Sequence, residues 1–389
     1  MSNLPLEMIA EILCRLTAKK LLCCRCVSKR WRTLIDSPTF IYLHLNHSIE
    51  SPCNLSIILK SSELYSLSFD LLDNIQPLDH PLMCYNHGVK ILGSCNGLLC
   101  ICNIVDDIAL WNPSIRAHRV VPYLPVELKR YFGMCSCRVS VFGFGYDLSN
   151  DDYKLVRIAQ FGGVDRKSFE SEVKVFSLRK NSWRRIADMP YCVLYPGENG
   201  IYANGALHWL VSQDPDSTVA DTIVALDLGV EDYHVVPKPE FVDMNCNMGV
   251  GVLQGCLSLL AYARSERVDV WVMEEYMVKE SWSKLFSVAR LEVIGILRSL
   301  KPLAYSKSGN EVLIEHDNVN LFWYDLKRKE VVNVWIQGVP ITFEAEICVG
   351  SLVPLNANRL RRRPKHEHKE TKNRKKRDDF LSEGFKLVL

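Results

Sequence analysis

The chain has 389 residues, of which 48% are hydrophobic, and a formal net charge of +2. A chain of this length and apolar content can form one large β domain with a buried core and a small helical domain beside it. A disordered chain is therefore excluded. No run of 18 apolar residues occurs, and the first residues lack a basic segment followed by an apolar core, so we expect neither a membrane span nor secretion.

Charge and cysteines narrow the function classes further. Residues 359–389 contain 12 Lys and Arg against five Asp and Glu, so this segment carries +7 and the remainder −5. An acidic body argues against nucleic-acid binding, because nucleic-acid-binding proteins present a basic face. The 15 cysteines are an odd number without a secretory signal, which indicates reduced packing residues.

Residues 4–45 have the pattern of three or four short amphipathic helices. Leu6, Ile9, Leu13 and Leu16 recur at helical spacing, and Ser37-Pro38 ends one helix and can start the next. So small a piece buries little surface alone. A second set of apolar residues, apart from the stripe above, is therefore expected to pack against another surface. This set comprises Met8, Ile12, Leu22 and Trp31.

The same segment, LPLEMIAEILCRLTAKKLLCCRCVSKRWRTLIDSPTF, resembles an F-box and departs at Thr17, where that family often has Pro. The resemblance implies binding to a Skp-type adaptor, and through it to a cullin and a RING subunit. The expected adaptor-binding residues are Leu4, Pro5, Ile9, Ile12, Leu13, Leu16, Leu22, Val27 and Trp31. A plain helical cap on the β domain is the structural alternative.

A zinc finger is a rival interpretation of this segment. Cys23 and Cys26 form a C-x-x-C, and His44 and His47 lie downstream. The spacings between the pairs and within the histidine pair do not fit such fingers, so we expect no metal and no other cofactor.

From about residue 50 to 355 the pattern changes to short strands with Gly-containing turns. A strand, a turn and a bulky residue recur from Ile108, Val173, Ile223, Val268 and Leu321, and each unit follows a hairpin near Gly93, Gly143, Gly205, Gly255 or Gly309. A period near 50 residues built from two hairpins predicts a kelch-type β-propeller or propeller-like array of five to seven blades. An irregular β-sandwich is the alternative.

The phrases GSCNGLLCI, LWNPS, GFGYDLSNDDYKLVRI and YANGALHW resemble the F-box-associated domain of plant F-box families. Within these families the chain resembles the type named constitutive expresser of pathogenesis-related genes, whose members are linked to plant defense through turnover of immune receptors. The resemblance alone does not identify a substrate.

The body contains no convincing catalytic signature. Gly143-x-Gly145 lacks the rest of a dinucleotide loop, Asp106-Asp107 and Asp151-Asp152 suit polar turns, and no nucleophile motif occurs. The tryptophans at 111, 183, 209, 282 and 323 repeat with the hairpins and are expected to pack within blades. Turns 150–152 and 179–182 are candidate target-contact positions, and the sequence does not identify the target.

The expected organisation is therefore mainly β: an all-α F-box over residues 1–45, a β-propeller-like substrate-binding domain over 46–357, and a basic, disordered tail over 358–389. A bipartite nuclear-import signal is expected in the tail and would use Arg361, Arg362, Arg363, Lys365, Lys372, Arg374, Lys375, Lys376 and Arg377.

We expect a non-catalytic substrate receptor of a Skp-cullin-F-box ubiquitin ligase, present in cytoplasm and nucleus, that binds a protein substrate and directs it to degradation by the proteasome. The alternative is a β-propeller that binds proteins or small molecules outside any ligase.

Overall fold

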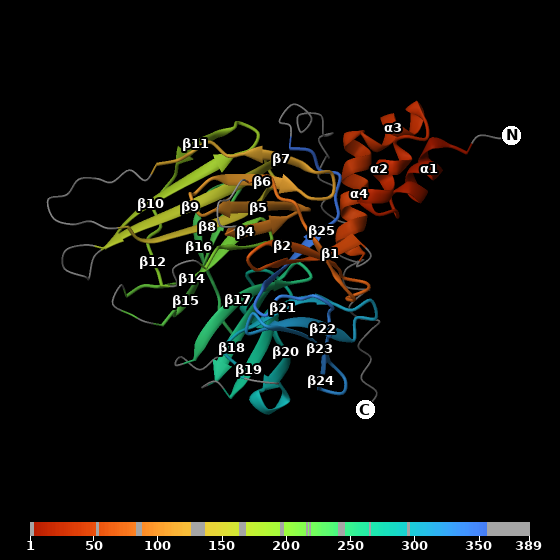
Figure 1. Cartoon of the computed structure of the whole chain (residues 1–389). Coiled ribbons are helices and arrows are strands. Elements are labelled where there is room, and N and C mark those ends of the chain that lie inside the picture. The colour runs from red at the N-terminus through yellow and green to blue at the C-terminus, as the bar shows by residue number, and fades with distance from the viewer. Residues whose placement is uncertain are drawn as a thin grey trace.

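The computed structural model describes residues 4–51, 54–82, 88–125, 137–162, 169–194, 198–214, 217, 219–239, 246–263, 266–293 and 296–355. Four short helices precede six antiparallel sheets arranged as the blades of a propeller (Figure 1). The fold class predicted from the sequence is thus confirmed, and the blade number is six. None of the described helices is long and apolar enough to cross a membrane.

The helices are α1 (Leu6–Leu13), α2 (Ala18–Cys24), α3 (Lys29–Ile35) and α4 (Pro38–Glu50). Three of them begin at a side-chain cap: the hydroxyl oxygens of Thr17, Ser28 and Ser37 each accept a backbone N–H three residues ahead. Thr17, the departure from the F-box pattern, therefore starts α2. Helix α4 runs five residues beyond residue 45 and leads toward the first strand.

The blades follow the chain in order, apart from the first, which combines strands from both ends. Blade 1 contains β25 (Glu344–Val349), β1 (Leu55–Lys60), β2 (Leu64–Ser68) and β3 (Ile75–Pro77). Blade 2 contains β4 (Val89–Cys95), β5 (Leu98–Asn103), β6 (Ile108–Asn112) and β7 (Ala117–Val120), and blade 3 contains β8 (Cys137–Asp147), β9 (Asp152–Gly162), β10 (Phe169–Ser177) and β11 (Ser182–Arg185).

Blade 4 has an inner strand in two pieces, β12 (Cys192–Val193) and β13 (Ile201–Ala203), followed by β14 (Ala206–Ser212), β15 (Thr222–Asp227) and β16 (Tyr233–Val236). Blade 5 contains β17 (Asn247–Leu253), β18 (Cys256–Ala263), β19 (Arg267–Met273) and β20 (Trp282–Ala289). Blade 6 contains β21 (Leu300–Tyr305), β22 (Glu311–His316), β23 (Asn320–Asp325) and β24 (Glu330–Asn333).

Pairing between β25 and β1 closes the ring. Their register runs from Leu55 opposite Val349 to Lys60 opposite Glu344, so a strand near residue 345 completes a sheet begun near residue 55. The innermost strands β25, β4, β8, β13, β17 and β21 neighbour one another around the ring. Closure removes the free inner edge that an open array of blades would leave.

Apolar cores lie between neighbouring blades. Gly143 and Gly145 on β8 allow blade 4 to pack closely, because a Cβ at Gly145 would lie 2.3 Å from the Tyr202 ring and one at Gly143 would lie 2.9 Å from Leu207 and Trp209. The Gly-x-Gly motif is therefore a packing feature of a strand, as the sequence indicated.

The propeller has two different ends. At one end, here called the turn end, lie the turns that join first to second and third to fourth strands, including two-residue turns at Asn96-Gly97, Asn204-Gly205 and Gln254-Gly255. At the other, the loop end, lie the turns between second and third strands and the connections between blades, which span ten residues each for β16–β17, β20–β21 and β24–β25. Because β1 begins at the turn end directly after α4, the helices lie at the turn end, beside β1 and β25 in Figure 1.

Candidate functional site

The inner face of the helical module is continuous with the propeller core. Leu13, Leu21, Ile35, Phe40 and Leu45 belong to one buried apolar cluster. The same cluster extends into blade 2 and into the segment after β25 through Leu98, Leu110, Leu352, Val353 and Leu355. The module therefore packs on the propeller by the hydrophobic effect.

Residues 350–355, here called the strap, fill the space between the helices and blade 2. The Asn112 Nδ2 atom donates to the carbonyl oxygens of Ser351 at 3.1 Å and Val353 at 3.0 Å, and Arg119 donates to that of Leu355 at 3.4 Å. Gly97 lets the strap approach, since a Cβ there would lie 2.5 Å from the Ser351 Oγ atom. These contacts fix the strap on blade 2, and its Leu352, Val353 and Leu355 share the buried apolar cluster with the helices.

The outer face of the helical module is apolar and exposed to solvent. Leu4, just before α1, and Met8 and Ile12 on α1 recur every four residues, and Ile12 is 57% exposed. Val27, after α2, is 67% exposed. Exposed apolar side chains gathered on one small module indicate an interaction surface. We call Leu4, Met8, Ile12 and Val27 the outer apolar face.

The other residues predicted for adaptor binding lie between these two faces. Pro5 is exposed, whereas Ile9, Leu16, Leu22 and Trp31 are half-buried and pack against the apolar cluster. Leu13 is buried within the cluster, where it supports the module from inside.

Exposed cations outnumber exposed anions on the helical module that carries the outer apolar face. Within residues 4–37 the exposed basic side chains are Arg15, Lys19, Lys20, Lys29, Arg30 and Arg32, and the exposed acidic ones are Glu7 and Glu11. The Arg25 guanidinium is engaged inside the module, with its Nε atom 2.9 Å from Asp36 Oδ1. A partner that buries this face would gain from carrying negative charge.

The zinc-ligand set considered from the sequence is not assembled. Cys23 and Cys26 are exposed, whereas His44 is buried and its Nε2 atom lies 3.0 Å from the Leu16 carbonyl oxygen. Burial lowers the pKa of His44, so the neutral imidazole stacks on Phe40 in the module core. The part of the chain that the structure describes contains no group of three or more His, Cys, Asp or Glu able to hold a metal ion.

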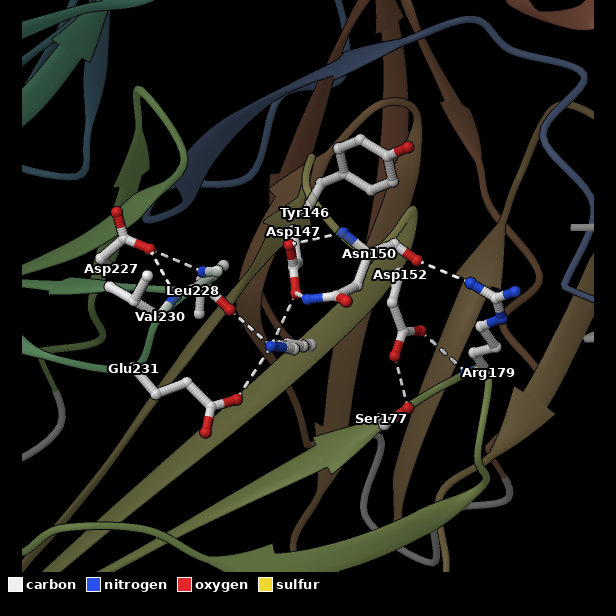
Figure 2. Close-up of polar contacts among 12 residues, drawn as sticks. Tyr146, Asp147, Asn150, Asp152, Ser177, Arg179, Asp227, Leu228, Val230 and Glu231 are labelled. Carbon is white, nitrogen blue, oxygen red and sulfur yellow. Dashed lines mark hydrogen bonds and ion pairs between the residues drawn. The ribbon is translucent and has the colours of Figure 1, made fainter. Parts of the chain in front are cut away.

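A buried ion-pair network joins blades 3 and 4 at the turn end (Figure 2). The Lys154 Nζ atom lies 2.7 Å from Asp147 Oδ2 and 2.8 Å from Glu231 Oε1, and it also donates to the Leu228 carbonyl oxygen. Burial opposes ionisation of Asp147, but hydrogen bonds from Lys154 and Asn150 overcome it and hold the pKa below the ordinary value. Arg184 pairs with the same Glu231 at the surface.

The two turns suggested for target contact are engaged with each other. Asp152 is buried and accepts hydrogen bonds from the Ser177 hydroxyl and, at 2.8 Å, from the Arg179 backbone N–H. Arg179 Nη1 donates to the Asn150 carbonyl oxygen at 2.8 Å (Figure 2). Both turns lie at the turn end, where these bonds fix their backbones.

The loop end carries strongly exposed apolar side chains that the sequence analysis did not single out. Trp335 is 87% and Ile341 is 91% exposed, both in the β24–β25 connection. The Phe343 N–H donates to the Asn318 carbonyl in the β22–β23 turn at the loop end, whereas the Gln337 N–H donates to the Asp73 carbonyl just before β3, so the middle of this connection runs along the outer strand of blade 1. Other exposed apolar residues of the loop end are Ile104, Val105, Tyr123, Leu291 and Ile296.

The repeating tryptophans mostly pack within the propeller. Trp111, Trp209 and Trp282 are buried, and Trp183 and Trp323 are half-buried. They are therefore core residues and do not form an exposed aromatic cage.

Comparison with known families agrees with this architecture. Residues 1–43 match the F-box domain, and residues 55–346 match the F-box associated beta propeller domain. The chain therefore belongs to the F-box proteins that carry an F-box associated propeller. The F-box domain implies binding to a Skp-type adaptor and a protein substrate, and F-box proteins are generally non-catalytic subunits.

Curated proteins of Arabidopsis thaliana are among those similar to the chain. The chain is 37% identical to the F-box protein CPR1 and 35% identical to a second F-box protein of that plant, in both cases over all of each chain. It is 33% identical to an F-box/kelch-repeat protein, over 80% of this chain and 85% of that one. The resemblance stated from the sequence, to plant F-box proteins with an F-box-associated domain and to their constitutive expresser type, is confirmed.

Proposed function

We propose that the protein is the substrate receptor of a Skp-cullin-F-box ubiquitin ligase. Its F-box binds the Skp-type adaptor, which connects to a cullin and a RING subunit, and its propeller binds the protein to be modified. The receptor acts by raising the effective concentration of the target beside the ubiquitin-loaded enzyme, and its own residues perform no chemistry.

One observation carries this proposal: the helical module has a buried face that packs on the propeller and a second apolar face that the described residues leave exposed. A helical cap that served the propeller alone would need only the buried face. The outer apolar face, together with the six exposed cations of the same module, is suited to a partner with an apolar and acidic surface.

We place target binding at the loop end. The adaptor approaches from the turn end, where the helices lie, so a target at the loop end avoids a clash with the adaptor. Trp335 and Ile341 are the strongest contact candidates there, because tryptophan and large aliphatic side chains dominate the energetics of interfaces.

The experiment is co-purification of the full chain from plant cells with proteasome inhibition. Recovery of a Skp-type adaptor together with a cullin supports the ligase function. Recovery of protein partners with neither adaptor nor cullin would favour the alternative, a propeller that acts outside a ligase.

Immune receptors are the first target class we propose to examine, because the chain resembles the type of F-box protein linked to their turnover. Overexpression of the chain should then shorten the half-life of such a receptor in a pulse-chase. An unchanged half-life for every receptor tested would remove this target class while leaving the adaptor interaction open to its own test.

We also propose that the basic segment between Arg361 and Arg377 directs part of the protein to the nucleus. This segment lies outside the described residues, and the proposal is supported by its composition alone. Truncation after Asn358 should reduce the nuclear share of a fluorescent fusion. An unchanged distribution would leave the segment as a solubility element.

A further inference from the structure

Two of the described cysteine thiols differ from the others in their exposure to solvent. Among the eleven cysteines whose side chains the structure describes, Cys23 and Cys26 are exposed, and the other nine are buried or half-buried. Both exposed thiols belong to the F-box, and they lie three residues apart at the end of α2. An oxidant that reaches the folded surface therefore meets these two described thiols first.

The backbone brings the two cysteines onto the same side of one turn. The Cys26 N–H donates to the Cys23 carbonyl oxygen at 3.0 Å, and Arg25 between them remains in the right-handed helical conformation. Side chains three residues apart on such a turn have Cβ atoms about 5–6 Å apart. A disulfide needs about 3.5–4.5 Å between Cβ atoms, so its formation would tighten this turn by about 1–2 Å.

The turn is connected to the surface that we assign to the adaptor. Leu22 directly precedes Cys23, and Val27, a member of the outer apolar face, directly follows Cys26. The Cys26 Sγ atom already lies 3.9 Å from the Leu22 carbonyl oxygen, within the same turn. Tightening the turn must therefore move Val27 relative to α1, which carries the rest of the outer apolar face.

We infer that Cys23 and Cys26 form a surface dithiol that a peroxide oxidises to a disulfide, and that this disulfide weakens adaptor binding. One thiolate attacks a peroxide oxygen and becomes a sulfenic acid while the other oxygen leaves as water or an alcohol. The second thiol then attacks the sulfenic sulfur, forms the S–S bond and releases water. Two electrons pass from the thiols to the peroxide, and a thiol reductant reverses the step.

The effect on binding rests on the proposed function, but formation of the disulfide does not. The full-length chain is treated with hydrogen peroxide or kept reduced, digested with trypsin without reduction, and analysed by mass spectrometry. Trypsin cleaves after Arg25, so a disulfide to Cys26 keeps two peptides linked. Cys24→Ser should keep this link, whereas Cys23→Ser should abolish it.

The second readout is affinity for a purified Skp-type adaptor by calorimetry. We expect oxidation to weaken binding by the wild-type chain about tenfold or more, since a displaced interface residue costs on the order of 1.4 kcal/mol or more. Reducing agent should restore the affinity, and the Cys23→Ser and Cys26→Ser chains should bind equally well with and without peroxide.

Each outcome decides the inference. Absence of the linked peptides, a link that persists in Cys23→Ser, or equal affinity of the reduced and disulfide-bonded chains would overturn it, as would an affinity loss that persists in Cys26→Ser. If the reduced wild-type chain binds no Skp-type adaptor, the proposed function is contradicted, and so is the effect of the disulfide on adaptor binding. The linked peptides still show whether Cys23 and Cys26 form a disulfide.

Discussion

The two ends of the propeller differ in how their surfaces are held. At the turn end, short turns are fixed by buried carboxylates: Asp147 pairs with Lys154, and Asp152 accepts bonds from the neighbouring turn. At the loop end, the connections are longer and expose Trp335 and Ile341 almost completely. The turn end therefore supports the fold and carries the F-box, and the longer connections of the loop end are consistent with the proposal that the target binds there.

The largest expected effect concerns the ion-pair network at the turn end. Asp147→Ala should lower the free energy of unfolding by about 3–5 kcal/mol, because it removes one anionic partner of the buried Lys154 ammonium. Chemical denaturation of the full chain measures the change. Asp232→Ala is the matched control at the same end: its exposed side chain should contribute less than about 0.5 kcal/mol. Equal stability of the two variants would contradict the assigned difference.

The same network predicts a loss of stability in acid. Burial opposes ionisation of Glu231 as well, but hydrogen bonds from Arg184 and Lys154 hold its pKa below the ordinary 4.5, and that of Asp147 lies below 3.8. Carboxyl groups with lowered pKa values stabilise the folded state above their ordinary pKa, and this contribution disappears as the pH falls through the lowered values.

Wild-type chain should therefore lose more stability than Asp147→Asn when the pH falls from about 5 to 2, since the variant lacks one of these titrating groups. Thermal unfolding at a series of pH values provides the measurement. Parallel pH profiles for the two chains would show that Asp147 does not stabilise the fold through its charge.

The smallest expected effect on stability is at the loop end. Trp335→Ala should change the free energy of unfolding by less than about 0.5 kcal/mol, because the side chain is 87% exposed and few contacts are lost. Trp209→Ala is the matched substitution in the core and should cost about 3–5 kcal/mol. If Trp335→Ala lowered the free energy of unfolding as much as Trp209→Ala, Trp335 would stabilise the fold, and the assigned difference between the two ends would be contradicted.

Five of the six blades were identified as repeats in the sequence. The sixth was covered only by the predicted range of five to seven blades. The repeats beginning at Ile108, Val173, Ile223, Val268 and Leu321 are the third strands β6, β10, β15, β19 and β23. Blade 1 has no such contiguous repeat, because its inner strand β25 comes from residues 344–349 and its other strands from residues 55–77. A period search compares neighbouring stretches and cannot join these two.

The site was predictable where it is local. Helical spacing and the F-box motif identified Ile12 and Val27, which are exposed together. The pairing of Lys154 with Glu231 joins residues 77 positions apart in different blades, so no local pattern indicates it. Trp335 lies in the apolar run VWIQGVPITF. The sequence of this run does not predict which of its side chains are exposed, because exposure depends on how the connection packs on the blades.

Direct calorimetry between a purified Skp-type adaptor and the full-length chain tests whether the outer apolar face is the adaptor-binding surface. Ile12→Ala should weaken binding by about 1.5–3 kcal/mol, or roughly tenfold or more, because the 57% exposed side chain becomes buried in the complex. Ile49→Ala on α4 is the matched control, with a similarly exposed isoleucine outside the proposed face, and should bind like the wild type. Wild-type affinity in Ile12→Ala, or an equal loss in Ile49→Ala, would contradict the assignment of this face.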